Sequence, residues 1–290
     1  MSDNTLLEKH NFTMQKKYGQ NFLTDVRIPA RIAAECTDFE IGEEKAESLI
    51  LEIGPGAGIL TKELAKRFAR VLAVEIDSDL IPILAESLAD YDNITVINRD
   101  IMEVELEPLL KQYRAFDGKT LPVSVCANLP YYITTPILMK LLEEYPDFDF
   151  LTVMVQKEVA RRLCATAGSD TYGAITAAIG LYGKASKLFD VSAGNFNPKP
   201  KVDSAVVKIA LYHPQRYTKK QIAAASKVIR AAFSMRRKTL VNTLLTLGAP
   251  HFSTKESLTA LVTELFGKPT VRGEELSTEQ FVLLAEKLGV

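Results

Sequence analysis

The sequence contains few cysteines and histidines, and this scarcity limits the chemistry that it can support. The three cysteines, Cys36, Cys126 and Cys164, are odd in number and far apart, which suits neither a disulfide framework nor paired zinc ligands. The three histidines are equally scattered, so a histidine-based metal site or catalytic triad has little support. We therefore expect reduced, partly buried thiols and no metal centre.

Long apolar runs are also missing. No run approaches the ~18 residues that a membrane helix needs, and the first residues have neither the basic nor the apolar segment of a signal peptide. We therefore expect a cytoplasmic protein. At 290 residues and 47% apolar composition, the chain can bury a large core, as one big domain or as a large and a small one.

The formal net charge of −1 argues at first against a nucleic-acid partner. The charges are unevenly distributed, however, because residues 214–290 contain 12 Lys/Arg and 6 Asp/Glu. Eight of these basic residues lie within 214–240, where there is no acidic residue. A solvated helix face remains one interpretation, but the lack of compensating acids favours a patch that faces phosphates.

Short apolar runs alternate with helical patterns over the first two-thirds of the chain, which is typical of a mainly parallel α/β sheet. We expect strands at 48–53, 70–76, 94–98, 123–127 and 151–156, helices at 59–67 and 80–88, and a closing antiparallel pair at 187–196 and 202–211. From residue 219 onward the pattern is helical only. The sequence thus predicts an α/β domain at 1–213 and a smaller all-α domain at 214–290.

A glycine-rich turn directly follows the first of these strands, at Gly54-Pro55-Gly56-Ala57-Gly58. Open α/β sheets bind ligands at the carboxyl ends of their strands, and glycines let the backbone pass close to a ligand. The dinucleotide fingerprint would place its third glycine at position 59, where this chain has Ile59. The spacing of Glu52, Gly54, Gly56 and Gly58 instead resembles the first motif of S-adenosylmethionine methyltransferases.

Acidic residues follow the next two strands. Glu75, with Ile76 after it, ends the second strand, where a carboxylate can accept hydrogen bonds from both hydroxyls of a ribose. A solvated acid at a strand end describes Asp77 better than Glu75. After the third strand, Asp100 is placed to accept from the amine of a cofactor's adenine and Ile101 to cover the ring. The ordered series at three strand ends is more specific than any one member.

The fourth strand leads into Asn128-Leu129-Pro130-Tyr131, which resembles the motif of enzymes that methylate amino groups on aromatic rings. The lone pair of such an amine is delocalised into the ring, so the amine is a poor nucleophile. The side-chain carbonyl of Asn128 and the backbone carbonyl of Leu129 or Pro130 could accept both N–H groups and favour the pyramidal nitrogen that attacks. Tyr131 would stack on the target base, and Phe196 could close its other face.

Five segments in order resemble the bacterial small-subunit ribosomal RNA adenine N6,N6-dimethyltransferases. They are KYGQNFL at 17–23, the glycine turn at 54–58, NLPY at 128–131, FNPKPKVDSAV at 196–206 and AFSMRRK at 232–238. The resemblance implies a Rossmann-like methyltransferase fold with S-adenosylmethionine as cofactor, enclosed in part by Asn21 and Leu23. It also implies that Asn128, beside Gly54, Glu75 and Asp100, contacts this cofactor. It further implies dimethylation of two adjacent adenosines in the 3′-terminal hairpin loop of 16S ribosomal RNA during assembly of the small subunit.

Details of the resemblance favour one branch of this group. The erythromycin-resistance methyltransferases of large-subunit RNA share the N-terminal signature, but the segment 196–206 and the long basic tail favour the small-subunit enzymes. Tyr18 stands where a smaller residue is expected before Gly-Gln. We expect Arg230, Arg236, Arg237 and Lys238 to position RNA through its phosphates, in a protein that acts as a monomer.

Two other functions remain open at this stage. A nicotinamide oxidoreductase would share the fold class, although the missing third glycine and the Asn-Leu-Pro-Tyr motif oppose it. A non-catalytic RNA-binding or assembly factor on the same fold is the other alternative.

Overall fold

The computed structural model describes residues 3–36, 45–235, 237–249 and 251–290. The chain divides into two compact units, one of Met1–Ala160 with Ser186–Leu211 and one of Arg161–Ala185 with Tyr212–Val290. The last crossing between units, after Leu211, lies two residues from the division expected after residue 213. The segment Arg161–Ala185 groups with the C-terminal helices, whereas the sequence division assigned it to the first domain.

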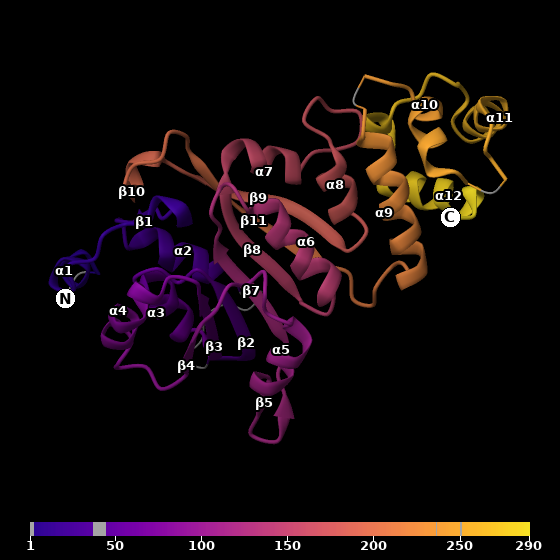
Figure 1. Cartoon of the computed structure of the whole chain (residues 1–290). Coiled ribbons are helices and arrows are strands. Elements are labelled where there is room, and N and C mark those ends of the chain that lie inside the picture. Colours follow the sequence, from indigo (N-terminus) through magenta and orange to yellow (C-terminus); the bar gives the residue numbers. More distant parts are fainter. Residues whose placement is uncertain (1–2, 37–44, 236, 250) are drawn as a thin grey trace. The chain divides into compact units, whose positions relative to one another are not determined.

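The first unit is built on a seven-stranded sheet in the order β4-β3-β2-β7-β8-β11-β9 (Figure 1). Its strands are β2 (Ala46–Ile53), β3 (Phe68–Glu75), β4 (Ile94–Asn98), β7 (Val123–Asn128), β8 (Phe150–Gln156), β9 (Gly183–Val191) and β11 (Ser204–Leu211). The strands β4, β3, β2, β7 and β8 run parallel, and β11 is antiparallel to β8. The five parallel strands expected from the sequence are confirmed to within two residues at each end.

Both faces of the central strands are buried, which explains their nearly continuous apolar runs. On one face, Ile50, Cys126 and Met154 pack with side chains of α2 (Arg27–Glu35) and α3 (Ile59–Ala65). The alternate residues point to the opposite face, and Leu49 and Val125 there are also at most 1% exposed. Helices cover the two sides of the sheet, as expected for an α/β unit (Figure 1).

Several helices of this unit were not anticipated from the sequence. They are α1 (Asp3–Lys9), α2, α5 (Leu106–Tyr113), α6 (Thr134–Glu144) and the first residues of α7 (Lys157–Leu163), which continues into the second unit, whereas α3 and α4 (Ile81–Ser87) were expected. A short hairpin, β5 (Ala115–Phe116) with β6 (Lys119–Thr120), was likewise missed.

The expected strand 187–196 is wrong at its C-terminal end. Strand β9 stops at Val191, and a turn at Ala193–Asn195 separates it from β10 (Phe196–Asn197). In place of continuing the large sheet, β10 pairs antiparallel with β1 (Phe22–Leu23), so that Leu23 lies opposite Phe196. This pairing joins the N-terminal segment to a region more than 170 residues away, which local periodicity does not reveal.

The second unit is almost entirely helical. It contains α8 (Ala174–Ile179), α9 (Lys219–Phe233), α10 (Leu240–Leu244), α11 (Lys255–Phe266) and α12 (Thr278–Leu288), together with the first residues of β9. The N-termini of α9 and α12 are capped by Thr218 with Gln221 and by Ser277 with Gln280, each pair bonding the other's backbone. The core includes the ring pair Phe233 and Phe281, whose centroids are 5.9 Å apart.

In the described ranges, none of the helices combines the length and apolarity required to cross a membrane.

Candidate functional site

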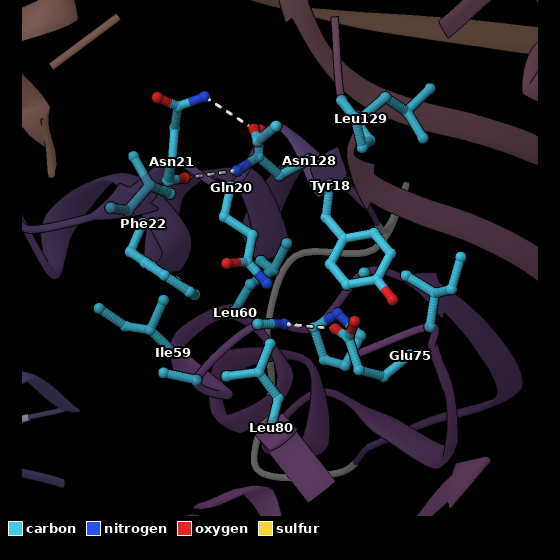
Figure 2. A pocket seen from close by; sticks show the side chains of 18 of the residues that line it. Tyr18, Gln20, Asn21, Phe22, Ile59, Leu60, Glu75, Leu80, Asn128 and Leu129 are labelled. Carbon is cyan, nitrogen blue, oxygen red and sulfur yellow. Dashed lines mark hydrogen bonds between the residues drawn. The ribbon is translucent and has the colours of Figure 1, made fainter. Parts of the chain in front are cut away.

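A pocket in the first unit lies at the carboxyl ends of β2, β3 and β7 (Figure 2). Together with the open solvent at its mouth it spans about 990 Å³. Ten of the residues predicted for cofactor or substrate line it: Asn21, Leu23, Gly54, Gly56, Glu75, Ile76, Asn128, Leu129, Pro130 and Tyr131. The sheet brings them together because its parallel strands all end at the same edge.

The glycine turn keeps the floor of this pocket open. Gly54 and Gly56 have φ angles of +70° and +61°, a region that favours glycine. A Cβ atom on Gly54 would meet no heavy atom within 4 Å, whereas one on Gly56 would lie 2.9 Å from the Phe22 ring. The turn therefore offers bare backbone to a ligand at Gly54, while at Gly56 it packs against the N-terminal segment.

Glu75 lies at the tip of β3 and is only 4% exposed. Its two carboxyl oxygens accept hydrogen bonds from the backbone N–H groups of Gly56 (3.2 Å) and Asp77 (2.9 Å). Burial raises the pKa of this carboxyl group, although both hydrogen bonds oppose the rise. Because a carboxylate has about four acceptor sites, Glu75 retains capacity for hydroxyl groups of a ligand.

The prediction that Asp77 is a solvated acid is wrong. It is 1% exposed and accepts a hydrogen bond of 2.6 Å from the side-chain amide of Gln20. The side-chain amide of Gln15 donates to Asp77 and to Asp79. Asp77 thus binds the N-terminal segment through hydrogen bonds from Gln15 and Gln20. Because these residues are distant along the chain, the local sequence around Asp77 does not predict the contact.

Glu52 is a pocket residue that the sequence-based assignment omitted. It lies two residues before Gly54 and is 1% exposed, and neither carboxyl oxygen has a hydrogen-bond partner among the residues that the structure describes. Burial raises the pKa of Glu52 to about 8. The Thr61 side chain opposes this rise but forms no hydrogen bond of normal geometry with either oxygen, so the carboxyl group can accept from a ligand's donor. Its place in the Glu-x-Gly-x-Gly spacing could have identified it.

Asn128 ends β7 and is held from two sides. Its side-chain amide donates to the backbone carbonyl of Asn21 at 3.4 Å (Figure 2), and the backbone N–H of Leu129 donates to the carbonyl of Met154 on β8. The carbonyl of Pro130 accepts from the backbone N–H of Ile133 (3.2 Å) and from the hydroxyl of Thr134 (3.0 Å). The acceptor capacity of Pro130 is thereby used within the first turn of α6.

The two predicted base-stacking residues differ in their placement. Tyr131 lines the pocket, and its hydroxyl lies 2.8 Å from that of Ser204. Phe196 is only 5% exposed, packs in the core cluster with Leu23 and Val191, and is not among the residues lining the pocket. In this structure the Phe196 ring serves the core, and it would have to shift in order to contact a base.

Two predicted cofactor residues also lie outside the lining. Asp100 and Ile101 follow β4, on the far side of β3, and neither is among the pocket residues. Asp100 accepts a hydrogen bond of 2.8 Å from the backbone N–H of Met102, and Ile101 is 6% exposed. Ile76, by contrast, lines the pocket and exposes 42% of its surface, which leaves it available for an apolar contact.

The N-terminal segment supplies more of the pocket than the two residues predicted. Tyr18, Gly19, Gln20 and Phe22 line it in addition to Asn21 and Leu23. The motif at 17–23 was recognised in the sequence, but which of its side chains face the pocket depends on the pairing of β1 with β10.

The predicted RNA-binding residues belong to the second unit. Arg230 lies near the end of α9, and Arg237 and Lys238 lie in the turn before α10; all three are exposed. Arg236 lies outside the described residues. On α9, Lys220, Lys227 and Arg230 share one exposed stripe, opposite the buried face formed by residues such as Val228 and Ala232. The local helix thus gathers positive charge on its solvent side.

No group of three or more His, Cys, Asp and Glu side chains capable of holding a metal ion occurs in the part of the chain that the structure describes.

Named proteins are similar to this chain over nearly its whole length. The relatives include proteins from Streptococcus sanguinis (42% identical over 283 residues, 98% of this chain and 94% of the relative) and Lachnoclostridium phytofermentans (42% over 285 residues, 97% and 93%). Both are named ribosomal RNA small subunit methyltransferase A.

Solved structures agree with this result. A dimethyladenosine transferase from Plasmodium falciparum matches with a TM-score of 0.74 at 25% identity, covering 93% of this chain and 98% of that one. The 23S rRNA methyltransferase ErmE matches with a TM-score of 0.69 at 25% identity, covering 93% and 100%. The first unit thus has the Rossmann-like methyltransferase fold. The family model described as ribosomal RNA adenine dimethylase matches residues 11–279, and the chain belongs to that family.

Proposed function

We propose that this enzyme transfers methyl groups from S-adenosylmethionine to the N6 amines of two adjacent adenosines in the 3′-terminal hairpin loop of 16S ribosomal RNA, within the assembling small subunit. The observation that carries the proposal is that the Asn128–Tyr131 motif shares one pocket with the glycine turn and Glu75. A group-transfer enzyme needs its donor and acceptor sites side by side. The names of the relatives support the small subunit as the substrate.

The pocket residues fit S-adenosylmethionine. Glu75 has acceptor capacity for the ribose hydroxyls, and Gly54 presents open backbone. The buried carboxyl group of Glu52 has no hydrogen bond of normal geometry to the described residues, and the ammonium group of the cofactor's methionine portion would supply one. Ile76 would cover the adenine ring, with Asp100 and Ile101 assigned to the outer end of the adenine. When bound, the cofactor supplies an electrophilic methyl group on a positive sulfur.

The chain's own contribution to catalysis is to orient and polarise the target amine. Because the Asn128 amide nitrogen donates to Asn21, its oxygen is left to accept one N–H of the adenosine. The second acceptor is the backbone carbonyl of Leu129, because Thr134 and Ile133 already occupy that of Pro130. Two such acceptors favour the pyramidal nitrogen and strengthen as charge develops on it.

Tyr131 provides the stacking face for the base at the mouth of the pocket. Bases on which enzymes act are extruded and gripped by aromatic or apolar side chains. Phe196 is the candidate for the other face, after a shift of the segment that contains it. Binding of the RNA backbone is assigned to the second unit, where Arg230, Arg236, Arg237 and Lys238 add charge without reading sequence.

The test is methyl transfer to small ribosomal subunits that lack the modification. We expect radiolabelled S-adenosylmethionine to label the 3′ end of 16S RNA, and mass spectrometry to detect dimethyladenosine at two neighbouring positions. Asn128→Ala is the matched inactive control. Labelling of 23S RNA instead would assign the enzyme to the erythromycin-resistance type, and tight NADH binding would support an oxidoreductase. Wild-type protein that binds subunits without methyl transfer would be an assembly factor only.

A further inference from the structure

Ser204, the first residue of β11, contacts Tyr131 on the substrate side of the site, and Asp203 directly precedes it. Ser204 is 1% exposed, and its hydroxyl lies 2.8 Å from the phenolic oxygen of Tyr131. Tyr131 belongs to the segment after β7, 73 residues earlier in the chain. The contact therefore ties the proposed base-stacking ring to a strand that is otherwise structural.

The position of Ser204 is itself fixed on both sides. In the register of the sheet it lies opposite Gln156 of β8. The backbone carbonyl of the preceding Asp203 accepts a hydrogen bond of 3.0 Å from the N–H of Lys157. The carboxylate of Asp203 accepts a second bond, of 2.9 Å, from the N–H of Ala193. Strand β11 thus begins at a point held by backbone groups from two other segments.

This arrangement restricts the motion of the tyrosine ring. A tyrosine held only through its Cα can turn about two side-chain torsions, and Tyr131 is only partly buried. A hydrogen bond from the far end of the ring to a fixed partner removes much of that freedom. Because Ser204 is buried, water competes poorly for the same bond. The tether fixes the plane on which a base would stack.

We propose that Ser204 is a positioning residue that holds the Tyr131 ring in the orientation required to stack on the target adenine, with Asp203 fixing the strand end from which Ser204 acts. The proposal rests on the proposed function. Ser204 then acts only through Tyr131. Replacing Ser204 should therefore slow the methyl-transfer step that follows binding of the cofactor and the RNA. A hydroxyl that merely satisfies a buried partner would affect stability and leave the methyl-transfer step unchanged.

The experiment is a double-mutant cycle with Tyr131→Phe, Ser204→Ala and the double variant, measured as single-turnover methyl transfer to unmodified small subunits at saturating cofactor and subunit. We expect each single variant to lose about ten-fold or more in rate, since small displacements of a reacting group are costly. The double variant should be no slower than either single variant, because both remove the same bond. Cofactor affinity should remain unchanged in all three.

Controls separate this effect from a general structural one. Ser204→Thr keeps the hydroxyl and should retain most of the rate. Ser186→Ala removes a serine hydroxyl that donates to the Lys208 carbonyl elsewhere on the same sheet, and should behave as wild type. Replacing the target adenosine with 2-aminopurine gives a direct readout, since loss of ordered stacking should alter its fluorescence in Ser204→Ala and Tyr131→Phe alike.

The possible outcomes are distinguishable. A folded Ser204→Ala variant with the wild-type single-turnover rate, or losses that simply multiply in the double variant, would overturn the positioning role. If Ser204→Ala does not fold, Tyr131→Phe decides, because a wild-type rate without the phenolic hydroxyl means that the tether is dispensable. Wild-type protein that transfers no methyl group to ribosomal RNA would instead contradict the proposed function.

Discussion

The side-chain amide of Asn128 donates a hydrogen bond to the backbone carbonyl of Asn21, across 107 residues of sequence. This bond joins the N-terminal segment, which lines the pocket, to the residue proposed to hold the target amine. Because the amide nitrogen of Asn128 is used in this bond, its amide oxygen is the atom left to accept a hydrogen bond from a substrate. The position of the N-terminal segment and the orientation of the proposed amine acceptor are therefore linked.

Loss of the Asn128 acceptor should reduce chemistry far more than binding. We expect Asn128→Ala to lower the single-turnover rate by about a hundred-fold or more, comparable to the loss of one preorganised dipole in other active sites. Cofactor affinity, measured by calorimetry, should change only slightly. A variant that binds and reacts like wild type would remove Asn128 from the mechanism.

Removal of the Glu75 carboxylate should weaken cofactor binding. Glu75→Ala deletes the proposed acceptor for two ribose hydroxyls and leaves the Gly56 N–H without its partner. We expect at least a ten-fold rise in the dissociation constant for S-adenosylmethionine, about 1.4 kcal/mol, with the far-ultraviolet circular dichroism unchanged. Glu47→Ala replaces an exposed glutamate near the start of β2 and is the matched control. Equal affinities in the two variants would contradict this assignment.

Glu52 should make the stability of the cofactor-free protein depend on pH. The pKa of this carboxyl group is about 8 in the fold against 4.5 in a free chain. Between these values the folded state binds more protons than the unfolded state, so the free energy of unfolding should fall as pH rises from about 5 to 8 and then level off. Denaturant titrations should show this slope in wild type.

Glu52→Gln cannot ionise and should lose that part of the slope. Saturating S-adenosylmethionine should also flatten the slope in wild type, since a cation beside Glu52 stabilises its charged form. Identical slopes for wild type and Glu52→Gln would show that Glu52 has no such raised pKa.

Glycine at position 56 should be needed for both conformation and packing. Gly56→Ala has to adopt a φ of +61° and places a Cβ 2.9 Å from the Phe22 ring. Gly248→Ala meets a similar φ of +58° with no atom within 4 Å, and so measures backbone strain alone, about 1–2 kcal/mol. We expect Gly56→Ala to be the less stable of the two, and to weaken cofactor binding, whereas Gly248→Ala should bind normally. Equal effects in thermal unfolding and cofactor titration would argue against a role of Gly56 in the pocket.

The basic turn before α10 should contribute to RNA binding through charge. Replacing Arg237 and Lys238 with alanine should reduce affinity for immature small subunits and lower the slope of log affinity against log salt by about 0.7 to 0.9 for each phosphate that the protein no longer neutralises. The variant Lys255→Ala/Lys287→Ala removes the same charge from exposed positions elsewhere in the second unit and should keep the wild-type slope. If both double variants behave alike, another surface binds the RNA.

Local sequence signals predicted the elements that hold the site. The parallel strands, the positive-φ glycine turn and the acid at the tip of β3 depend on hydrophobic period and on the conformational freedom of glycine, and both are properties of a few consecutive residues. The helix α6 was not predicted, and its first residue, Thr134, is important for the site. The Thr134 hydroxyl donates to the carbonyl of Pro130, which leaves the carbonyl of Leu129 as the proposed second acceptor beside Asn128.

The sequence by itself determined that strand ends would present a glycine turn, acids and the Asn-Leu-Pro-Tyr motif at one edge of a sheet. Only the tertiary structure decided which of these side chains face the pocket. Asp77 is buried under the N-terminal segment, Phe196 packs in the core opposite Leu23, and Glu52 lies in the pocket without a partner among the described residues. The physical reason is that burial and hydrogen-bond pairing depend on contacts between segments that are distant along the chain, and no local pattern encodes those contacts.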